Sequence, residues 1–144
     1  LNQGTEGDGP MSVALLKEMF ERMVVAKDPT LIPAYYHPDF RMTSNGVEQG
    51  YAEFAAGHER VYDTAITYAV RYDEQAWVQA VDRVAGRLWI TTSRPGRPAT
   101  ELEIVLVATF RDGLIHRVWE VTWPDWSTLP ELEAYEAAEN IPNE

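Results

Sequence analysis

Apolar residues recur at helical spacing in two stretches of the N-terminal half. Ser12 can cap the first helix, which we expect to reach about Lys27 and whose apolar stripe comprises Leu16, Phe20, Met23 and Val24. The second helix is predicted from about Gly50 to Tyr62, and one face carries Tyr51, Phe54, Ala55, His58, Val61 and Tyr62. His58 therefore lies within an apolar helical face.

A shorter helix is expected between these two, with Asp28 as its cap and Pro29 in its first turn. It should reach Tyr35-Tyr36 and end there, because the residue before Pro38 avoids helical geometry. Further along the chain the periodicity becomes that of strands. The predicted strands cover residues 40–43, 66–72, 77–93, 101–111 and 114–123, and Asp112-Gly113 is a hairpin signal between the last two. A final helix is predicted from Thr128 to about Asn140.

Helices followed by strands with tight turns predict an α+β fold, with N-terminal helices packed on a curved antiparallel sheet. The longest predicted strand is apolar on both faces: one carries Leu102, Ile104, Leu106, Ala108 and Phe110, and the other Val105, Val107 and Thr109. A sheet with one face in water should alternate more cleanly. We therefore predict a homodimer built sheet to sheet.

The length of 144 residues fits one domain. We expect residues 1–10 to be a disordered extension, residues 11–129 to form the domain, and residues 130–144 to form an acidic C-terminal helix and tail. No apolar run is long enough to span a membrane, and residues 1–10 lack the apolar stretch of a signal peptide. The absence of cysteine excludes disulfides and thiolate chemistry and fits a cytoplasmic location.

The net charge of -11 is concentrated near the chain ends. All 12 basic residues lie within residues 11–124, whereas eight of the 23 acidic residues lie outside that span. This distribution provides no basic surface, so we expect neither nucleic acid nor an anionic membrane as a partner.

Three short motifs occur in the order typical of the SnoaL-like branch of the NTF2-like superfamily, which this chain resembles from about Met11 to Leu129. The motifs are Tyr35-Tyr36-His37-Pro38-Asp39-Phe40, Gly50-Tyr51-Ala52-Glu53-Phe54, and Asp112-Gly113-Leu114-Ile115 leading to Trp119-Glu120. The resemblance implies a cone-shaped barrel that encloses an apolar pocket. Its relatives include ketosteroid isomerases, polyketide cyclases, scytalone dehydratases and limonene-epoxide hydrolases, alongside non-enzymatic domains, so the fold alone does not give the function.

Glu120 is the first candidate catalytic residue. The resemblance implies a pocket-facing acid after the tryptophan of the last strand, and here Glu120 stands where aspartate is more usual. A carboxylate in an apolar pocket has a raised pKa, which suits proton transfer. The alternative is that Glu120 faces solvent or pairs with an arginine across the sheet.

His58 and Tyr36 are the other catalytic candidates. His58 could be a general acid or base opposite Glu120, or a histidine at the edge of the core. Tyr36 could donate a hydrogen bond to a developing oxyanion, as a tyrosine does in isomerase relatives, or simply pack with a satisfied hydroxyl. The substrate-binding candidates are Phe40, Tyr62, Trp89, Leu106 and Trp119, although the tryptophans could equally be core or interface residues.

Two charged pairs bear on epoxide hydrolysis, for which relatives carry Arg-x-Asp on one strand. Asp82 and Arg83 are adjacent and should point to opposite faces, and Arg71 and Asp73 lie at a strand end. Both observations disfavour that chemistry. The three histidines have no ligand spacing, so we expect no metal and no cofactor.

Three functions remain open on sequence alone. The first is a cofactor-independent isomerase or lyase, such as a cyclase or dehydratase, that acts on a small apolar or aromatic ligand with Glu120 as base. The second is a non-enzymatic pocket protein that binds or carries such a ligand. The third is a dimeric association module in which the acidic C-terminal helix docks a partner.

Overall fold

The computed structural model describes residues 13–129. The helical segments are α2 (Val13–Met19), the π-helical η2 (Phe20–Val25), the 3-10 turn η3 (Pro29–Leu31), α3 (Ile32–Tyr35), α4 (Tyr51–Tyr62) and the 3-10 turn η4 (Trp126–Thr128). The strands are β1 (Tyr36–Ser44), β2 (Val47–Gly50), β3 (Thr67–Tyr72), β4 (Val78–Gln79), β5 (Arg83–Arg94), β6 (Arg97–Arg111) and β7 (Leu114–Trp123).

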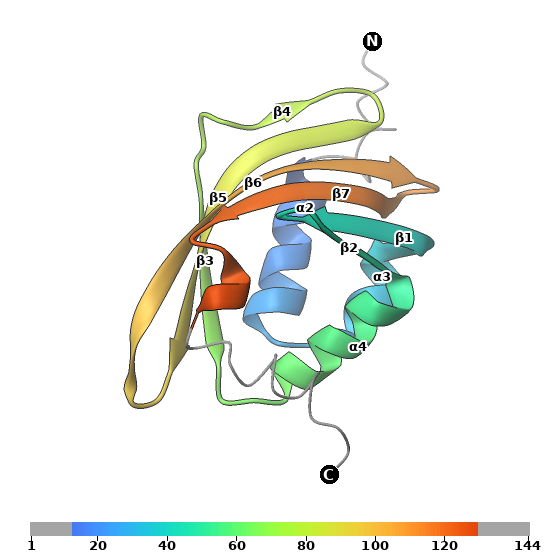
Figure 1. Cartoon of the computed structure of the whole chain (residues 1–144). Helices are drawn as coiled ribbons and strands as arrows, with labels where there is room; N and C mark the ends of the chain where they lie inside the picture. The colour runs from blue at the N-terminus through green and yellow to red at the C-terminus, as the bar shows by residue number, and fades with distance from the viewer. Residues whose placement is uncertain (1–12, 130–144) are drawn as a thin grey trace.

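The strands form one curved sheet in the order β2-β1-β7-β6-β5-β3, with β4 paired to β5. The strands arch over α2, α3 and α4, so that one face of the sheet looks toward the helices and the other away from them (Figure 1). All pairings are antiparallel except that of β1 with β7, which is parallel. The predicted α+β class is therefore confirmed, with a mixed rather than purely antiparallel sheet.

Local sequence accounts for the ends of the two main helices. Lys27 adopts a positive φ of 56° after η2, and its ammonium donates to the carbonyls of Thr64 and Ile66. At the start of α4, the Glu53 carboxylate accepts a hydrogen bond of 2.7 Å from the Gly50 N–H. These bonds satisfy groups at the helix ends and tie the first helical segment to the loop after α4.

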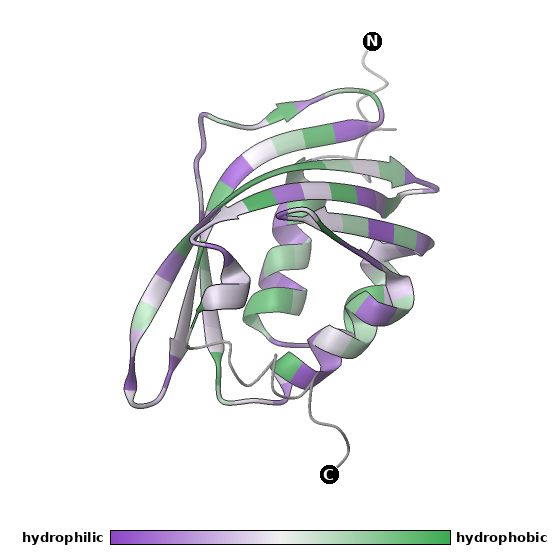
Figure 2. Cartoon of the chain, viewed as in Figure 1, coloured by the Kyte–Doolittle hydropathy of each residue, from purple (hydrophilic) through white to green (hydrophobic). Residues whose placement is uncertain are grey.

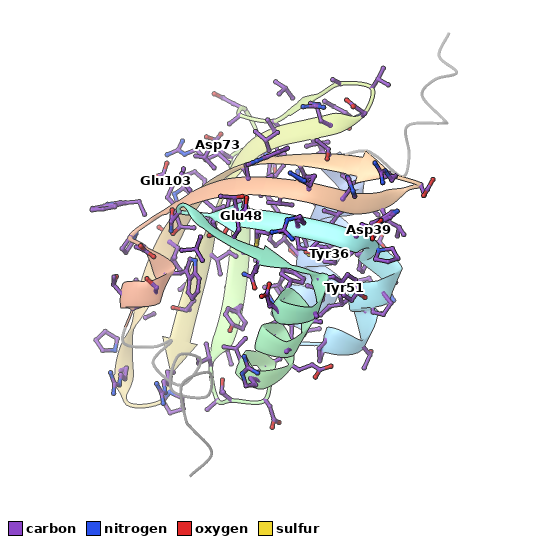
Figure 3. All side chains as sticks on the ribbon, turned by 45° about the vertical axis from the view of Figure 1, so that its right-hand side comes forward. Tyr36, Asp39, Glu48, Tyr51, Asp73 and Glu103 are labelled. Carbon is purple, nitrogen blue, oxygen red and sulfur yellow. The ribbon has the colours of Figure 1, made fainter. Side chains whose placement is uncertain are left out.

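Hydrophilic residues interrupt the hydrophobic ones along β5 and β7, whereas the middle of β6 is hydrophobic without interruption from Ile104 to Ala108 (Figure 2). The inward-facing residues pack with the helices into one core, in which the Phe54 ring of α4 lies within 5 Å of the rings of Tyr36 and Phe40. Figure 3 shows Tyr36 on the helix side of the sheet, and Asp73 and Glu103 on the opposite side. The sheet thus has an inner face that buries the core and an outer face that does not.

The structure corrects several predicted boundaries. The strand predicted at 40–43 begins at Tyr36, because His37 and Pro38 continue the extended backbone instead of ending a helix. The single strand predicted over 77–93 is two strands, β4 and β5, separated by a turn. The predicted extension at 1–10 lies outside the described residues, as does nearly all of the predicted C-terminal helix.

Candidate functional site

A cavity of about 200 Å³ lies between the inner face of the sheet and the helices. Most of its lining is apolar, from α2, η2, α4 and all the long strands. Its polar lining residues are Tyr36, Ser44, Gln49, His58, Tyr62, Tyr68, Thr92, Glu120, Thr122 and Trp126. Among residues 13–129, Glu120 is the only acid in this lining, and no lysine or arginine contributes to it.

Glu120 projects from β7 into the cavity, as the sequence predicted for the pocket-facing alternative. Its Oε2 accepts a hydrogen bond of 2.7 Å from Ser44 Oγ, and Ser44 Oγ accepts one of 3.1 Å from Trp126 Nε1. Burial raises the pKa of Glu120, and the bond from Ser44 opposes that rise. One carboxyl oxygen is therefore held, and the protonated form is more favoured than it would be for a glutamate in water.

The turn after β1 keeps this arrangement in place. Asn45 donates from its backbone N–H to the Glu120 carbonyl at 3.0 Å, and its side chain bonds both the N–H and the hydroxyl of Thr122. Asn45 adopts a φ of 50°, a left-handed conformation that asparagine tolerates better than most residues. The β1–β2 turn and the end of β7 are thus locked together beside the carboxyl group.

Tyr36 lies close enough to Glu120 for the two groups to interact electrostatically. Burial, and then the Glu120 charge, raise the pKa of Tyr36, so its hydroxyl stays protonated. Within residues 13–129, that hydroxyl donates to Met19 Sδ, at 3.4 Å, and to no other group, and a thioether is a weak acceptor. A ligand oxygen would be a better acceptor for this proton.

His58 and Tyr62 line the cavity from α4. His58 Nδ1 lies 2.8 Å from the Phe54 carbonyl oxygen, which can only accept, so Nδ1 carries the proton. Burial lowers the pKa of His58, which favours the neutral ring with Nε2 as an acceptor. The Tyr62 side chain is 7% exposed, and its buried hydroxyl has no hydrogen-bond partner within residues 13–129.

The other predicted substrate-binding residues divide between the two faces of the sheet. Leu106 lines the cavity, and Phe40 packs behind it against Tyr36. Trp89 and Trp119 do not reach the cavity. Trp89 stacks with the guanidinium groups of Arg71 and Arg87 on the outer face, and Trp119 is 41% exposed there.

The charged pairs considered for epoxide hydrolysis also lie away from the cavity. Arg71 pairs with Glu101 on the outer face, and Asp73 pairs with Arg87 at 2.8 Å. Asp82 and Arg83 form an exposed pair with each other. Within the described part of the chain, no three His, Asp or Glu side chains are grouped to hold a metal ion, and no helix is long and apolar enough to cross a membrane.

Ser44, which bonds the Glu120 carboxyl group, was not predicted from the sequence. Trp126, which bonds Ser44, was considered only as one of several tryptophans that could line the pocket or pack in the core or an interface. Ser44 pairs with Glu120 in the parallel register of β1 and β7, so both side chains point to the inner face. The only sequence signal was the position of Ser44 directly before the Asn45-Gly46 turn. That position fixes the end of a strand and does not reveal which strand lies beside it.

The raised pKa of Glu120 predicts a stability that depends on pH. The folded state binds the Glu120 proton more tightly than the unfolded state does. The contribution of this group to the stability of the fold is therefore complete below the ordinary pKa of 4.5, and it is lost as the pH rises through the folded-state pKa. Over that interval the free energy of unfolding should fall by about 1.4 kcal/mol per pH unit. Urea unfolding across a pH series should show that Glu120→Gln removes this fall.

The exposed Glu59→Gln is the matched control, since it removes one carboxyl group without altering the cavity. Its stability should follow that of the unsubstituted protein at every pH. Parallel curves for the unsubstituted protein and Glu120→Gln would show that folding does not perturb the Glu120 carboxyl.

A curved sheet closed on one side by helices around one apolar cavity defines an α+β pocket protein of the NTF2-like class. The sequence-family model of the SnoaL-like domain matches residues 16–118 of this chain. The chain belongs to the SnoaL-like domain family, which confirms the resemblance inferred from the three motifs. A comparison with curated proteins found no match.

Solved structures support the same fold. PrhC from Penicillium brasilianum is similar with a TM-score of 0.68 and 16% identity, over 88% of this chain and 91% of that chain. An LEH-like epoxide hydrolase from M. tuberculosis has a TM-score of 0.63 and 15% identity, over 87% and 92%. IdmH from Streptomyces antibioticus, a proposed polyketide cyclase, has a TM-score of 0.60 and 18% identity, over 87% and 99%.

Proposed function

We propose that this protein is a cofactor-independent isomerase or lyase that moves a proton on a small, apolar carbonyl compound. Glu120 is the general base, Tyr36 is the hydrogen-bond donor to the carbonyl oxygen, and the cavity binds the substrate. The observation that carries the proposal is the Glu120 carboxyl in an apolar cavity, with a raised pKa and with one oxygen held by Ser44. A base of raised pKa is matched to proton abstraction near neutral pH.

The proposed step begins with the ionised Glu120 carboxylate and a ketone whose α-carbon faces it. The carboxylate takes the α-proton, the electron pair of the broken C–H bond forms the C=C bond of an enolate, and the carbonyl oxygen gains the negative charge. The Tyr36 hydroxyl donates a hydrogen bond to that oxygen. If the ketone has a β,γ double bond, return of the proton from Glu120 to the γ-carbon moves the double bond into conjugation and isomerises the substrate. If it has a β-hydroxyl, that group takes the proton from Glu120 and leaves as water, which dehydrates the substrate.

The names of structural neighbours are compatible with this chemistry. IdmH is described as a proposed polyketide cyclase, and another neighbour, from Rhodopseudomonas palustris, as a proposed isomerase. An epoxide hydrolase of the type that uses an Arg-x-Asp strand pair is less well supported for this chain, because Arg71 and Asp73 lie outside the cavity lining.

Exchange of α-protons with solvent deuterium tests the proposal without knowledge of the natural substrate. The probe is 2-tetralone, a small two-ring ketone with acidic α-protons, incubated in D₂O and followed by proton NMR. The protein should accelerate loss of the α-proton signal, and Glu120→Gln should remove the acceleration. Binding of the probe without any acceleration would instead favour a carrier of small ligands.

We also propose that the outer face of β6 and β7 joins two copies of the chain, as the sequence predicted. Val105 pairs with Val121 across the two strands, and both are exposed, at 45% and 59%. Trp119 and Trp123 extend the same exposed face. An apolar patch of this kind on a sheet favours association with an identical patch on a second copy.

Sedimentation equilibrium should therefore give the mass of a dimer. Val121→Glu places a charge at the centre of this patch and should shift the equilibrium to monomer, because an unpaired carboxylate is costly to bury. Val47→Glu is the control, since Val47 is 61% exposed on β2, away from the patch, and this variant should remain dimeric. A monomeric mass for the unsubstituted protein would contradict the proposal.

A further inference from the structure

The α4 wall of the cavity presents two hydrogen-bonding groups that the proposed reaction does not use. His58 and Tyr62 are one helical turn apart on α4, and their rings meet edge to face with centroids 5.4 Å apart. Both side chains line the cavity. The Tyr62 hydroxyl is buried and lacks a partner within residues 13–129, a costly arrangement unless a ligand supplies one.

The two groups have complementary hydrogen-bonding roles. The bond from His58 Nδ1 to the Phe54 carbonyl leaves Nε2, on the other side of the ring, as an acceptor. The Tyr62 hydroxyl can donate, because burial raises the pKa of Tyr62 and keeps the proton in place. A ligand hydroxyl can satisfy both at once, since it donates through its hydrogen and accepts through its oxygen.

The rest of the cavity limits the charge and size of the ligand. Its lining within residues 13–129 contains no lysine or arginine to balance an anion, and the Glu120 carboxyl would disfavour a second negative charge. A volume of about 200 Å³ is below the range of about 300–1,000 Å³ typical of pockets for drug-sized ligands. The rings of Phe54, Tyr36 and Tyr68 offer flat apolar surfaces to a small ring system.

We propose that His58 and Tyr62 form a recognition site for one hydroxyl group of a small, uncharged aromatic or enolic ligand, separate from Glu120. His58 Nε2 accepts the hydrogen of that hydroxyl, and Tyr62 donates to its oxygen. This inference rests on the proposed function only in taking the cavity as the substrate site. It identifies the substrate class as a phenol, enol or alcohol that also carries the reacting carbonyl group.

Three two-ring probes separate the two hydrogen bonds. The first, 2-naphthol, can donate and accept, 2-methoxynaphthalene can only accept, and naphthalene can do neither. Their dissociation constants should be measured by calorimetry or tyrosine and tryptophan fluorescence on the full chain. The unsubstituted protein should bind 2-naphthol most tightly and naphthalene least tightly, with each hydrogen bond changing the affinity by roughly two- to tenfold.

Tyr62→Phe removes one oxygen atom. It should weaken the binding of 2-naphthol and of 2-methoxynaphthalene by roughly two- to tenfold and leave the affinity for naphthalene unchanged. Because the hydroxyl is unpartnered, this variant should be no less stable than the unsubstituted protein. His58→Phe should weaken only 2-naphthol. Tyr35→Phe is the matched control: Tyr35 is buried and bonded to Glu18, outside the cavity lining, so all three affinities should stay the same.

Glu120→Gln separates this inference from the proposed function. The ratio of 2-naphthol to 2-methoxynaphthalene affinity should be unchanged in that variant, even though proton exchange is lost. Unchanged 2-naphthol affinity in Tyr62→Phe would overturn the inference. It would also be overturned if the ratio of 2-naphthol to 2-methoxynaphthalene affinity were lost in Glu120→Gln but kept in His58→Phe. Failure of 2-naphthol to bind at all would also overturn it. Exchange that survives Glu120→Gln would remove only the proposed catalytic role.

Discussion

Glutamine at position 120 should lower the rate of 2-tetralone proton exchange by about two to four orders of magnitude, the contribution typical of a general base. The amide keeps the size and the hydrogen-bonding capacity of the side chain, so Ser44 can still donate to its oxygen. What the amide loses is the ability to take a proton. The affinity for the probe should therefore change much less than the exchange rate.

The pH dependence of the exchange provides an independent sign of the base. The rate should rise with pH through the folded-state pKa of Glu120, because only the carboxylate accepts a proton. Glu59→Gln, an exposed control, should keep both the rate and the profile. Exchange that is unaffected by Glu120→Gln and lost in His58→Phe would transfer the role of base to His58.

Alanine at position 86 should destabilise the fold by about 1–3 kcal/mol, the usual effect of overpacking a core. Gly86 lies on the inner face of β5, opposite Leu106, and the Trp77 indole packs directly on its backbone. A Cβ at Gly86 would lie 2.1 Å from Trp77 Cδ2 and Cε3, which are atoms of a rigid ring. Either the indole or the strand must then move.

A double-mutant cycle with Trp77→Ala tests that cause. Once the indole is removed, Gly86→Ala should have little effect on the free energy of unfolding, measured in urea. An equal loss of stability in both backgrounds would mean that the strand backbone, and not the contact with Trp77, requires glycine.

Periodicity along the chain was sufficient to predict most of the elements. The helical stripe through Phe54, His58 and Tyr62 does form one face of α4 and does line the cavity. The hairpin signal at Asp112-Gly113 joins β6 and β7, with both residues at positive φ. Such features depend on interactions within a few residues, which the sequence displays directly.

The strand predicted over residues 77–93 was wrong because the chain turns between β4 and β5, where the Ala80 N–H donates to the Arg83 carbonyl. Across this turn, Trp77 packs on Gly86. A contact of this kind brings together residues from separate elements. Strand propensity cannot predict it, since propensity describes single residues and not their partners.

The sequence by itself determined the α+β class, the order of the elements, and which residues share a face with Glu120 or His58. It left open which face of the sheet looks inward, because both faces of the long strands are apolar. The tertiary structure decided this: Leu88 is fully buried, whereas its neighbour Trp89 lies against arginines on the outer face.

The tertiary structure also decided what holds Glu120. The parallel pairing of β1 with β7 brings Ser44 beside a carboxyl group 76 positions away, and Trp126 reaches the same hydroxyl from η4. Alternation along a strand specifies a face, because adjacent side chains must point in opposite directions. The neighbour across that face depends on strand pairing, which is set by the packing of the whole sheet on its helices.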